Sequence, residues 1–149
     1  MSGAQKVLIY GTWHGRVLVF DEPDFPDLAL QVPGGTVEAG EDFAAAAARE
    51  FFEETGILPP VSPSLIMCAD YRFERDGQSV LHHRHFFHLP LKGSFPESWI
   101  HWEKTPYDGG APIRFRLFWL GFEEACKRLG MGMEGGLVTL LQGPQLRTD

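Results

Sequence analysis

Three glutamates, Glu50, Glu53 and Glu54, stand in a stretch whose composition predicts a helix. At about 100° per residue they fall on one narrow stripe, at positions i, i+3 and i+4. Like charges this close repel one another and destabilise an isolated helix. A divalent cation would convert the repulsion into coordination, and Mg²⁺ prefers oxygen ligands and often bridges carboxylates to phosphates. The alternative to a metal site is that the three glutamates form a solvent-exposed acidic face, which is the usual role of clustered glutamates.

The residues around this stripe favour a ligand site. Arg49 precedes Glu53 by four residues, so the two side chains can meet on the helix surface. Gly35, in the turn before the helix, lets the backbone approach a ligand closely because glycine has no Cβ. Glu38 and Glu41 add two more acids beside the same site. A solvated acidic face would normally carry lysines between its acidic residues, and no lysine is present in this stretch.

The stretch from Gly35 to Ile57 resembles the Nudix box, G-x5-E-x7-R-E-U-x-E-E-x-G-U, in which U is a bulky aliphatic residue. Its fixed positions are matched in register by Gly35, Glu41, Arg49, Glu50, Glu53, Glu54, Gly56 and Ile57. Phe51 stands where an aliphatic residue is usual, and this departure affects packing rather than chemistry. The order of the expected strands around the box also resembles the Nudix fold.

This resemblance implies a metal-dependent hydrolase. Such an enzyme cleaves the diphosphate linkage of a nucleoside diphosphate derivative or of a nucleoside triphosphate, and the expected cofactor is Mg²⁺, with Mn²⁺ as a substitute. The implied metal ligands are Gly35, through its backbone carbonyl, Glu50, Glu53 and Glu54. The implied catalytic residues are Glu53, Glu50 and Arg49. The guanidinium of Arg49 would orient a metal-binding glutamate.

The general base within this family varies. Glu53 is the expected base, because a carboxylate can accept the proton of the attacking water. Glu97 and Glu103, which follow a histidine-rich strand, are the alternatives. A different function, a catalytically silent domain that binds a nucleotide or a partner, would be indicated by a damaged box, and this box is intact.

Arginines outside the box are the candidate substrate ligands, since guanidinium groups bind phosphate. They are Arg84, Arg114 and Arg116. Arg114 and Arg116 share one face of an expected strand. The alternative to phosphate binding is that they belong to the solvent-exposed face of a sheet. The four histidines between His82 and His88 alternate between two faces of a strand and are not expected to converge on a metal.

The elements that position these residues follow from the sequence pattern. Strands are expected at 6–10, 16–20, 28–32, 65–73, 79–89 and 113–120, and helices at 42–55 and 122–129. Segment 93–110 is expected to be a long loop. The first helix is expected to bury the side that carries Ala44, Ala48, Phe51, Phe52 and Thr55. These elements predict one domain over 1–149, of α/β (α+β) class, with the mixed β-sheet sandwiched between α-helices that the resemblance implies.

The net charge of −7 restricts the partners. Residues 21–54 hold ten acids and one base, so the acidity is concentrated around the box, where cations could hold phosphates. Nonspecific nucleic-acid binding comes from Lys and Arg. The expected partner is therefore a small nucleotide diphosphate, with no long nucleic acid, and an mRNA-processing function is disfavoured.

The cellular location is predicted from the apolar runs, the first residues and the cysteines of the sequence. No apolar run approaches the ~20 residues of a membrane helix, and residues 1–6 lack the pattern of a signal peptide. Cys68 and Cys126 stand alone and are expected to be reduced, buried thiols. We therefore expect a cytoplasmic protein without a membrane partner. A homodimer is possible from the family resemblance.

Overall fold

Strand β1 (Ala4–Trp13) is the centre of the fold. Its C-terminal end forms a hairpin with β2 (Arg16–Asp21), and its N-terminal half pairs antiparallel with β3 (Gly34–Thr36). Along most of its length it also pairs in parallel with β5 (Gln78–Pro90). The computed structural model describes residues 3–103 and 109–143, and within them the strands form a seven-stranded mixed sheet in the order β4-β5-β1-β2-β7-β6, with β3 beside β1.

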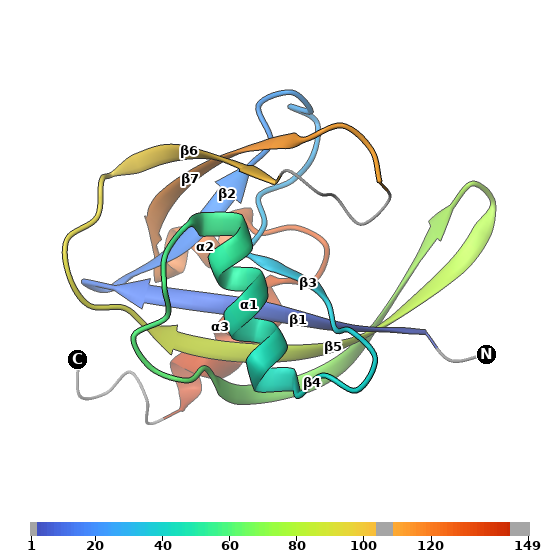
Figure 1. Ribbon diagram of the computed structural model, residues 1–149, viewed down its shortest axis with the longest axis horizontal. Coiled ribbons are helices and arrows are strands. Elements are labelled where there is room, and N and C mark those ends of the chain that lie inside the picture. The colour runs from blue at the N-terminus through green and yellow to red at the C-terminus, as the bar shows by residue number, and fades with distance from the viewer. Residues whose placement is uncertain (1–2, 104–108, 144–149) are drawn as a thin grey trace.

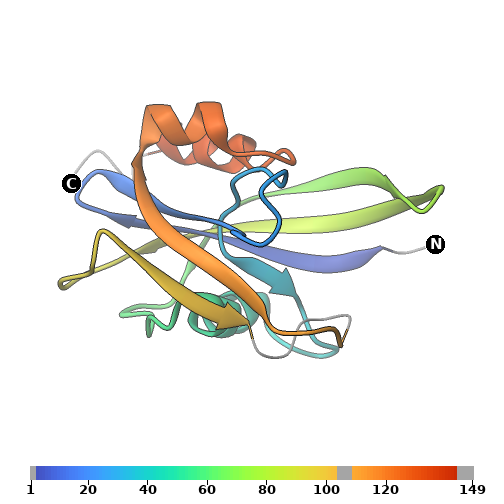
Figure 2. The same cartoon turned by 90° about the horizontal axis from the view of Figure 1, so that it is seen from above.

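Helices cover both faces of this sheet. Helix α1 lies on one face, and α2 and α3 lie on the other (Figure 1 and Figure 2). The remaining elements are β4 (Ser64–Arg75), β6 (Ser98–Glu103), β7 (Ile113–Gly121), α1 (Phe43–Thr55), α2 (Phe122–Arg128) and α3 (Glu134–Gln142). The predicted class, a mixed sheet sandwiched between helices, is confirmed.

The alternation of β1 divides the core into two layers. Val7 and Ile9 pack with Phe51 of α1, whereas Leu8 and Tyr10 pack on the side of α2 and α3. All five side chains are buried. Successive strand residues point to opposite faces, so one apolar strand can supply both layers.

Helix α1 begins and ends where the sequence predicts. The Asp42 side chain accepts a hydrogen bond from the Ala45 N–H at 3.0 Å, which satisfies one of the donors left open in the first turn. Gly56 ends the helix in the left-handed conformation, with φ of 80°, and its N–H donates to the Phe52 carbonyl. The box is therefore held on a helix with fixed ends.

The orientation of α1 differs from the prediction. Its buried residues are Ala46, Ala47, Phe51, Glu54 and Thr55, whereas Phe52, which was expected to bury, is 44% exposed. At about 100° per residue, the centre of this buried face lies only about 60° from Glu50. The glutamate stripe therefore overlaps the edge of the buried face, and Phe52 faces away from the sheet.

The N-cap of α1 gives a test of stability. We expect Asp42→Ala to lower the free energy of unfolding by about 1 kcal/mol, because the Ala45 N–H loses its acceptor. Asp42→Ser, which keeps an acceptor, should lower it by less. Urea denaturation of the variants measures both values, and equal losses in the two would contradict the capping role.

Strand β3 lies where the sequence predicted a turn, just after the segment that was expected to be a strand. Instead of a strand at 28–32, the chain makes isolated bridges from Leu30 and Gln31, and pairs with β1 only from Gly34 onward. A Cβ at Gly34 would lie 2.4 Å from the Val7 carbonyl oxygen. Glycine is what permits this close pairing, although it is otherwise unfavourable in strands.

Two other elements were not predicted. The segment expected as a loop at 93–110 contains β6, which pairs antiparallel with β7, the next strand along the chain. Helix α3 lies in the glycine-rich segment after residue 130. There, a Cβ at Gly136 would lie 2.4 Å from the Tyr10 hydroxyl, so close packing explains the glycine.

The two cysteines are not joined by a disulfide. Cys68 and Cys126 are free thiols, as predicted, but their expected burial was wrong, because Cys68 is exposed and Cys126 is only half-buried. Cys68 lies on β4, at an edge of the sheet. Within the described part of the chain, every helix is too short or too polar to cross a membrane.

Candidate active site

Glu54 is the most deeply buried of the box glutamates. Its side chain accepts a hydrogen bond from the Gly34 N–H at 2.8 Å, and the residue is 7% exposed. Burial raises the pKa of the Glu54 carboxyl well above its usual range, against the effect of this hydrogen bond. Helix α1 and strand β3 thus hold a carboxylate whose charge lacks solvation.

Glu50 lies against the backbone of Gly35. A Cβ at Gly35 would lie 2.2 Å from the Glu50 carboxyl carbon, so only glycine allows the two to approach as they do. Burial raises the pKa of Glu50 to about 7, although its hydrogen bond to Arg49 acts in the opposite direction. The structure therefore brings the predicted ligands Gly35 and Glu50 together.

Arg49 joins the acids of the box. Its Nε and Nη2 atoms donate to the two carboxylate oxygens of Glu41 at 2.8 and 2.9 Å, a bidentate pair. Its Nη1 atom donates to Glu50 at 2.8 Å and lies 3.4 Å from Glu53. The contact between Arg49 and Glu53 that the helical spacing predicts is present, and the stronger pair with Glu41 was not predicted.

The box glutamates have the donor chemistry of a site for a divalent metal ion. Glu50, Glu53 and Glu54 offer oxygen alone, which suits a hard divalent cation. Each of these glutamates is held by Arg49 or by the Gly34 N–H. Among residues 3–103 and 109–143, no three His, Cys, Asp or Glu side chains already converge in a metal-binding arrangement. The chemistry of the donors fits the ion, and binding would require the carboxylates to reorient.

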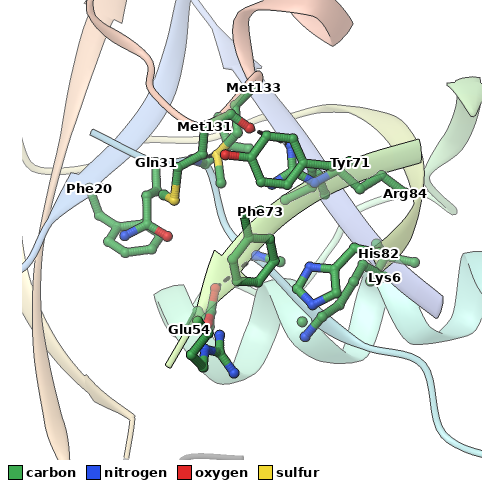
Figure 3. A pocket seen from close by; sticks show the side chains of 16 residues that line it. Lys6, Phe20, Gln31, Glu54, Tyr71, Phe73, His82, Arg84, Met131 and Met133 are labelled. Atoms are coloured by element: carbon green, nitrogen blue, oxygen red, sulfur yellow. Dashed lines mark hydrogen bonds between the residues drawn. The ribbon is translucent and has the colours of Figure 1, made fainter. Parts of the chain in front are cut away.

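A cleft opens beside Glu54. Its narrow part has a volume of about 300 Å³, and it continues into a wider part of about 1240 Å³. Both parts share Lys6, Phe20, Gln31, Glu54, Arg75 and His82 as lining residues. Figure 3 shows Glu54 and Lys6 at one end of the narrow part, and Tyr71, Met131 and Met133 toward the other. The box therefore borders a cavity large enough for a small ligand.

The wall of the cleft opposite the acids carries nitrogen groups. Lys6 donates to the Thr36 hydroxyl at 2.6 Å, and burial lowers the pKa of its ammonium while the charges of Glu50 and Glu54 act in the opposite direction. Burial, together with the charge of Lys6, lowers the pKa of His82 to about 4, so this imidazole is neutral at pH 7. An acidic wall and a nitrogen-rich wall thus face the same space.

The predicted substrate ligands do not all reach this cleft. Arg84 lines it but is only 6% exposed, with its guanidinium carbon 3.8 Å from the centre of the Tyr71 ring. Arg114 and Arg116 lie on the face of β7 opposite Phe115, which lines the wider part of the cleft. Their partners there are Asp24 and Asp21. Substrate binding by these arginines remains a prediction.

The candidate bases lie in different places. Glu97 forms a bidentate pair with Arg16 at 2.9 and 3.1 Å, at the far end of β6 from Glu103. These two positions are about 20 Å apart along an extended strand. Glu103 lines the cleft, and the side chain of Glu53 is 52% exposed beside Arg49. Glu53 is thus part of the box and Glu103 lines the cleft, whereas Glu97 lines neither part of the cleft.

The histidines of β5 have separate partners. His83 bonds to Asp70, and His85 lies between Cys68 and Gln5. His88 bonds to the Thr12 hydroxyl.

Several cleft residues were not identified from the sequence. Lys6, Tyr71, Phe73 and Met131 come from segments far apart in the chain, and Lys6 stands directly beside Arg84 in the parallel pairing of β1 and β5. Of these residues, the sequence could have indicated only Lys6 in advance, because a lysine at the start of an apolar strand is unusual enough to suggest a binding role.

Comparison with known proteins agrees with this arrangement. Residues 4–133 match the family of the NUDIX domain, so the chain belongs to the Nudix family, whose hydrolases generally use divalent metals. Two relatives are named RNA pyrophosphohydrolase: one from Brucella abortus is 34% identical over 99 residues, and one from Roseobacter denitrificans is 42% identical over 57. The matches cover 65% and 38% of this chain, but only 51% and 36% of those relatives.

Solved structures share the fold. The MutT protein from Bacillus halodurans superimposes with a TM-score of 0.67 at 21% identity, over 96% of this chain and 85% of that protein. At this identity the likeness extends to the fold alone.

Proposed function

We propose that this chain is a metal-dependent hydrolase that cleaves a diphosphate linkage in a nucleotide. The observation that carries the proposal is the contact of Gly35 with Glu50 at the edge of a cleft that also holds Glu54 and Lys6. Carboxylates this poorly solvated gain most from a cation. A phosphate chain in the cleft would lie between that cation and the ammonium of Lys6.

The metal ligands of this proposal are Glu50, Glu53, Glu54 and the carbonyl of Gly35, with Mg²⁺ as the ion and Mn²⁺ as a substitute. A bound ion of this kind neutralises phosphate oxygens and lowers the pKa of bound water. The raised pKa values of Glu50 and Glu54 support this assignment, because burial and neighbouring charges destabilise their ionised forms until a cation balances them.

The protein's own groups have distinct roles in this proposal. Glu53 accepts the proton of the attacking water, since its carboxylate is the most exposed of the three glutamates. Arg49 positions Glu50 and Glu53 and is itself fixed by Glu41. Lys6 holds phosphate oxygens by charge-assisted hydrogen bonds.

The substrate is proposed to be a small nucleotide, because the net charge of −7 disfavours a long nucleic acid. A second candidate is the 5′-triphosphate end of an RNA. The names of the Brucella and Roseobacter relatives favour it, and the wider part of the cleft has room for a continuing chain. A silent nucleotide-binding domain is the alternative to both.

A substrate panel with controlled metal tests the proposal. In the presence of Mg²⁺, we expect release of a hydrolysis product from at least one of a set of nucleoside triphosphates, dinucleoside polyphosphates, nucleotide sugars and 5′-triphosphate RNA. The product is phosphate or pyrophosphate from a triphosphate, and a nucleotide from a dinucleoside polyphosphate or a nucleotide sugar. Chelation with EDTA should stop the release, and excess Mg²⁺ should restore it. Turnover that persists in EDTA would contradict metal dependence, and binding without turnover of any compound would indicate the silent domain.

A further inference from the structure

We infer that the apolar end of the cleft binds the nucleobase of the substrate, with the ring of Phe73 as its stacking surface. This inference rests on the proposed function, which already makes the substrate a nucleotide. It deepens that proposal by assigning the place where the base lies and the side chain on which it stacks.

The walls of this pocket suit a planar ring. Tyr71 and Phe73 come from β4, Phe20 comes from β2, and Met131 and Met133 come from the segment before α3. Figure 3 shows these side chains around one space. Every base has a π-face that stacks on aromatic side chains, and the polarisable thioether of methionine makes favourable contacts with rings. A volume of about 300 Å³ is at the lower end for small-ligand sites.

The order of groups along the cleft matches the order of groups in a nucleotide. Glu54 and Lys6 lie at one end, Phe73 lies between, and Met131 and Met133 lie at the other end (Figure 3). Phosphates near the acidic residues would therefore leave the base against Phe73. The Phe73 ring is already held in place, with His82 at its edge, 5.0 Å between centroids, and Arg75 5.2 Å from its centre.

Arg84 is a positioning residue for this pocket. Its guanidinium stacks on Tyr71, and its Nη1 atom donates to the Met131 carbonyl, so one buried side chain links β4 to the segment before α3. Met131 and Gly132 both have positive φ, 56° and 76°. A non-glycine residue rarely adopts this conformation, and the hydrogen bond from Arg84 helps to keep Met131 in it.

Binding measurements with two probes test the inference. AMP and ribose 5-phosphate differ only in the base, and isothermal titration of the full chain with Mg²⁺ gives the affinity for each. We expect AMP to bind at least tenfold more tightly than ribose 5-phosphate. Phe73→Leu should weaken AMP about tenfold and leave ribose 5-phosphate unchanged, because leucine fills the space without an aromatic face.

Two further variants complete the experiment. Phe25→Leu, in an exposed loop outside the cleft, should leave both affinities unchanged. Arg84→Lys should weaken AMP several-fold without changing ribose 5-phosphate, since lysine keeps the charge but lacks the planar group. A general structural defect would instead lower both affinities together, and thermal denaturation of each variant shows whether it folds.

The outcomes separate this inference from the proposed function. Equal affinities for AMP and ribose 5-phosphate, or an AMP affinity unaffected by Phe73→Leu, would overturn the base pocket even if the chain hydrolyses nucleotides. Phe73-dependent AMP binding in a chain that hydrolyses no member of the substrate panel would support the pocket and overturn the hydrolase.

Discussion

Replacement of Glu53 by glutamine is expected to lower kcat by about 10²–10⁴-fold, the usual contribution of a positioned general base. Glutamine keeps the size of the side chain but cannot accept the proton of the attacking water. Stability should change little, because the Glu53 carboxylate is half exposed and its pair with Arg49 is long, at 3.4 Å. The measurement is kcat for the best compound of the substrate panel.

The concentration of Mg²⁺ separates the two roles proposed for Glu53. If Glu53 only bound metal, saturating Mg²⁺ would restore much of the turnover in Glu53→Gln. If it is the base, kcat stays low at every Mg²⁺ concentration. Near-normal turnover of this variant would refute the assignment.

Two matched variants identify the alternative bases. Glu97→Gln removes a carboxylate that is paired with Arg16 and does not line the cleft, so kcat should stay within about twofold. Glu103→Gln removes a carboxylate that lines the cleft and whose charge contributes, after burial, to the raised pKa of Glu50. A large loss in Glu103→Gln beside a small one in Glu53→Gln would make Glu103 the base.

Replacement of Gly35 by alanine is the second prediction with a large effect. The new Cβ would lie 2.2 Å from the Glu50 carboxyl carbon, so the carboxylate must move away from the Gly35 backbone and from its hydrogen bond to Arg49. A misplacement of about 1 Å in an active site can cost about 10²-fold in rate, and we expect kcat/KM to fall by at least that much.

Stability should respond far less than activity to this substitution. The clash is with the end of a flexible side chain rather than with the backbone, so we expect the free energy of unfolding to fall by only about 1 kcal/mol, the low end for overpacking. Gly135→Ala is a matched control, because a Cβ there meets nothing within 4 Å. Alanine within helix α3 should raise stability by about 0.5 kcal/mol and leave turnover unchanged. Equal activity in the two alanine variants would show that Gly35 does not position Glu50.

The box could be read from the sequence because its geometry is local. Helical periodicity alone puts Glu50, Glu53 and Glu54 on one stripe, and Asp42 and Gly56 fix the ends of the helix through hydrogen bonds to residues a few positions away. Such interactions depend on spacing along the chain, which a sequence states directly.

The arrangement around the box was decided by tertiary structure. Which glutamate is buried depends on how α1 is rotated against the sheet, and the prediction that Phe52 faces inward failed for this reason. Strand β6 was missed although it pairs with the next strand along the chain, because none of its side chains is fully buried and its sequence lacks an apolar run.

The sequence by itself determined the acidic helix, its caps and the family, and the tertiary structure decided what faces that helix across the cleft. Lys6, Phe73 and Met131 belong to three segments that meet only through the pairing of β1 with β5, of β5 with β4, and the packing of the segment before α3. A shift of one residue in any strand register would turn its side chains to the other face. The register depends on the burial of both faces of the sheet at once, a property of the whole fold that no local spacing encodes.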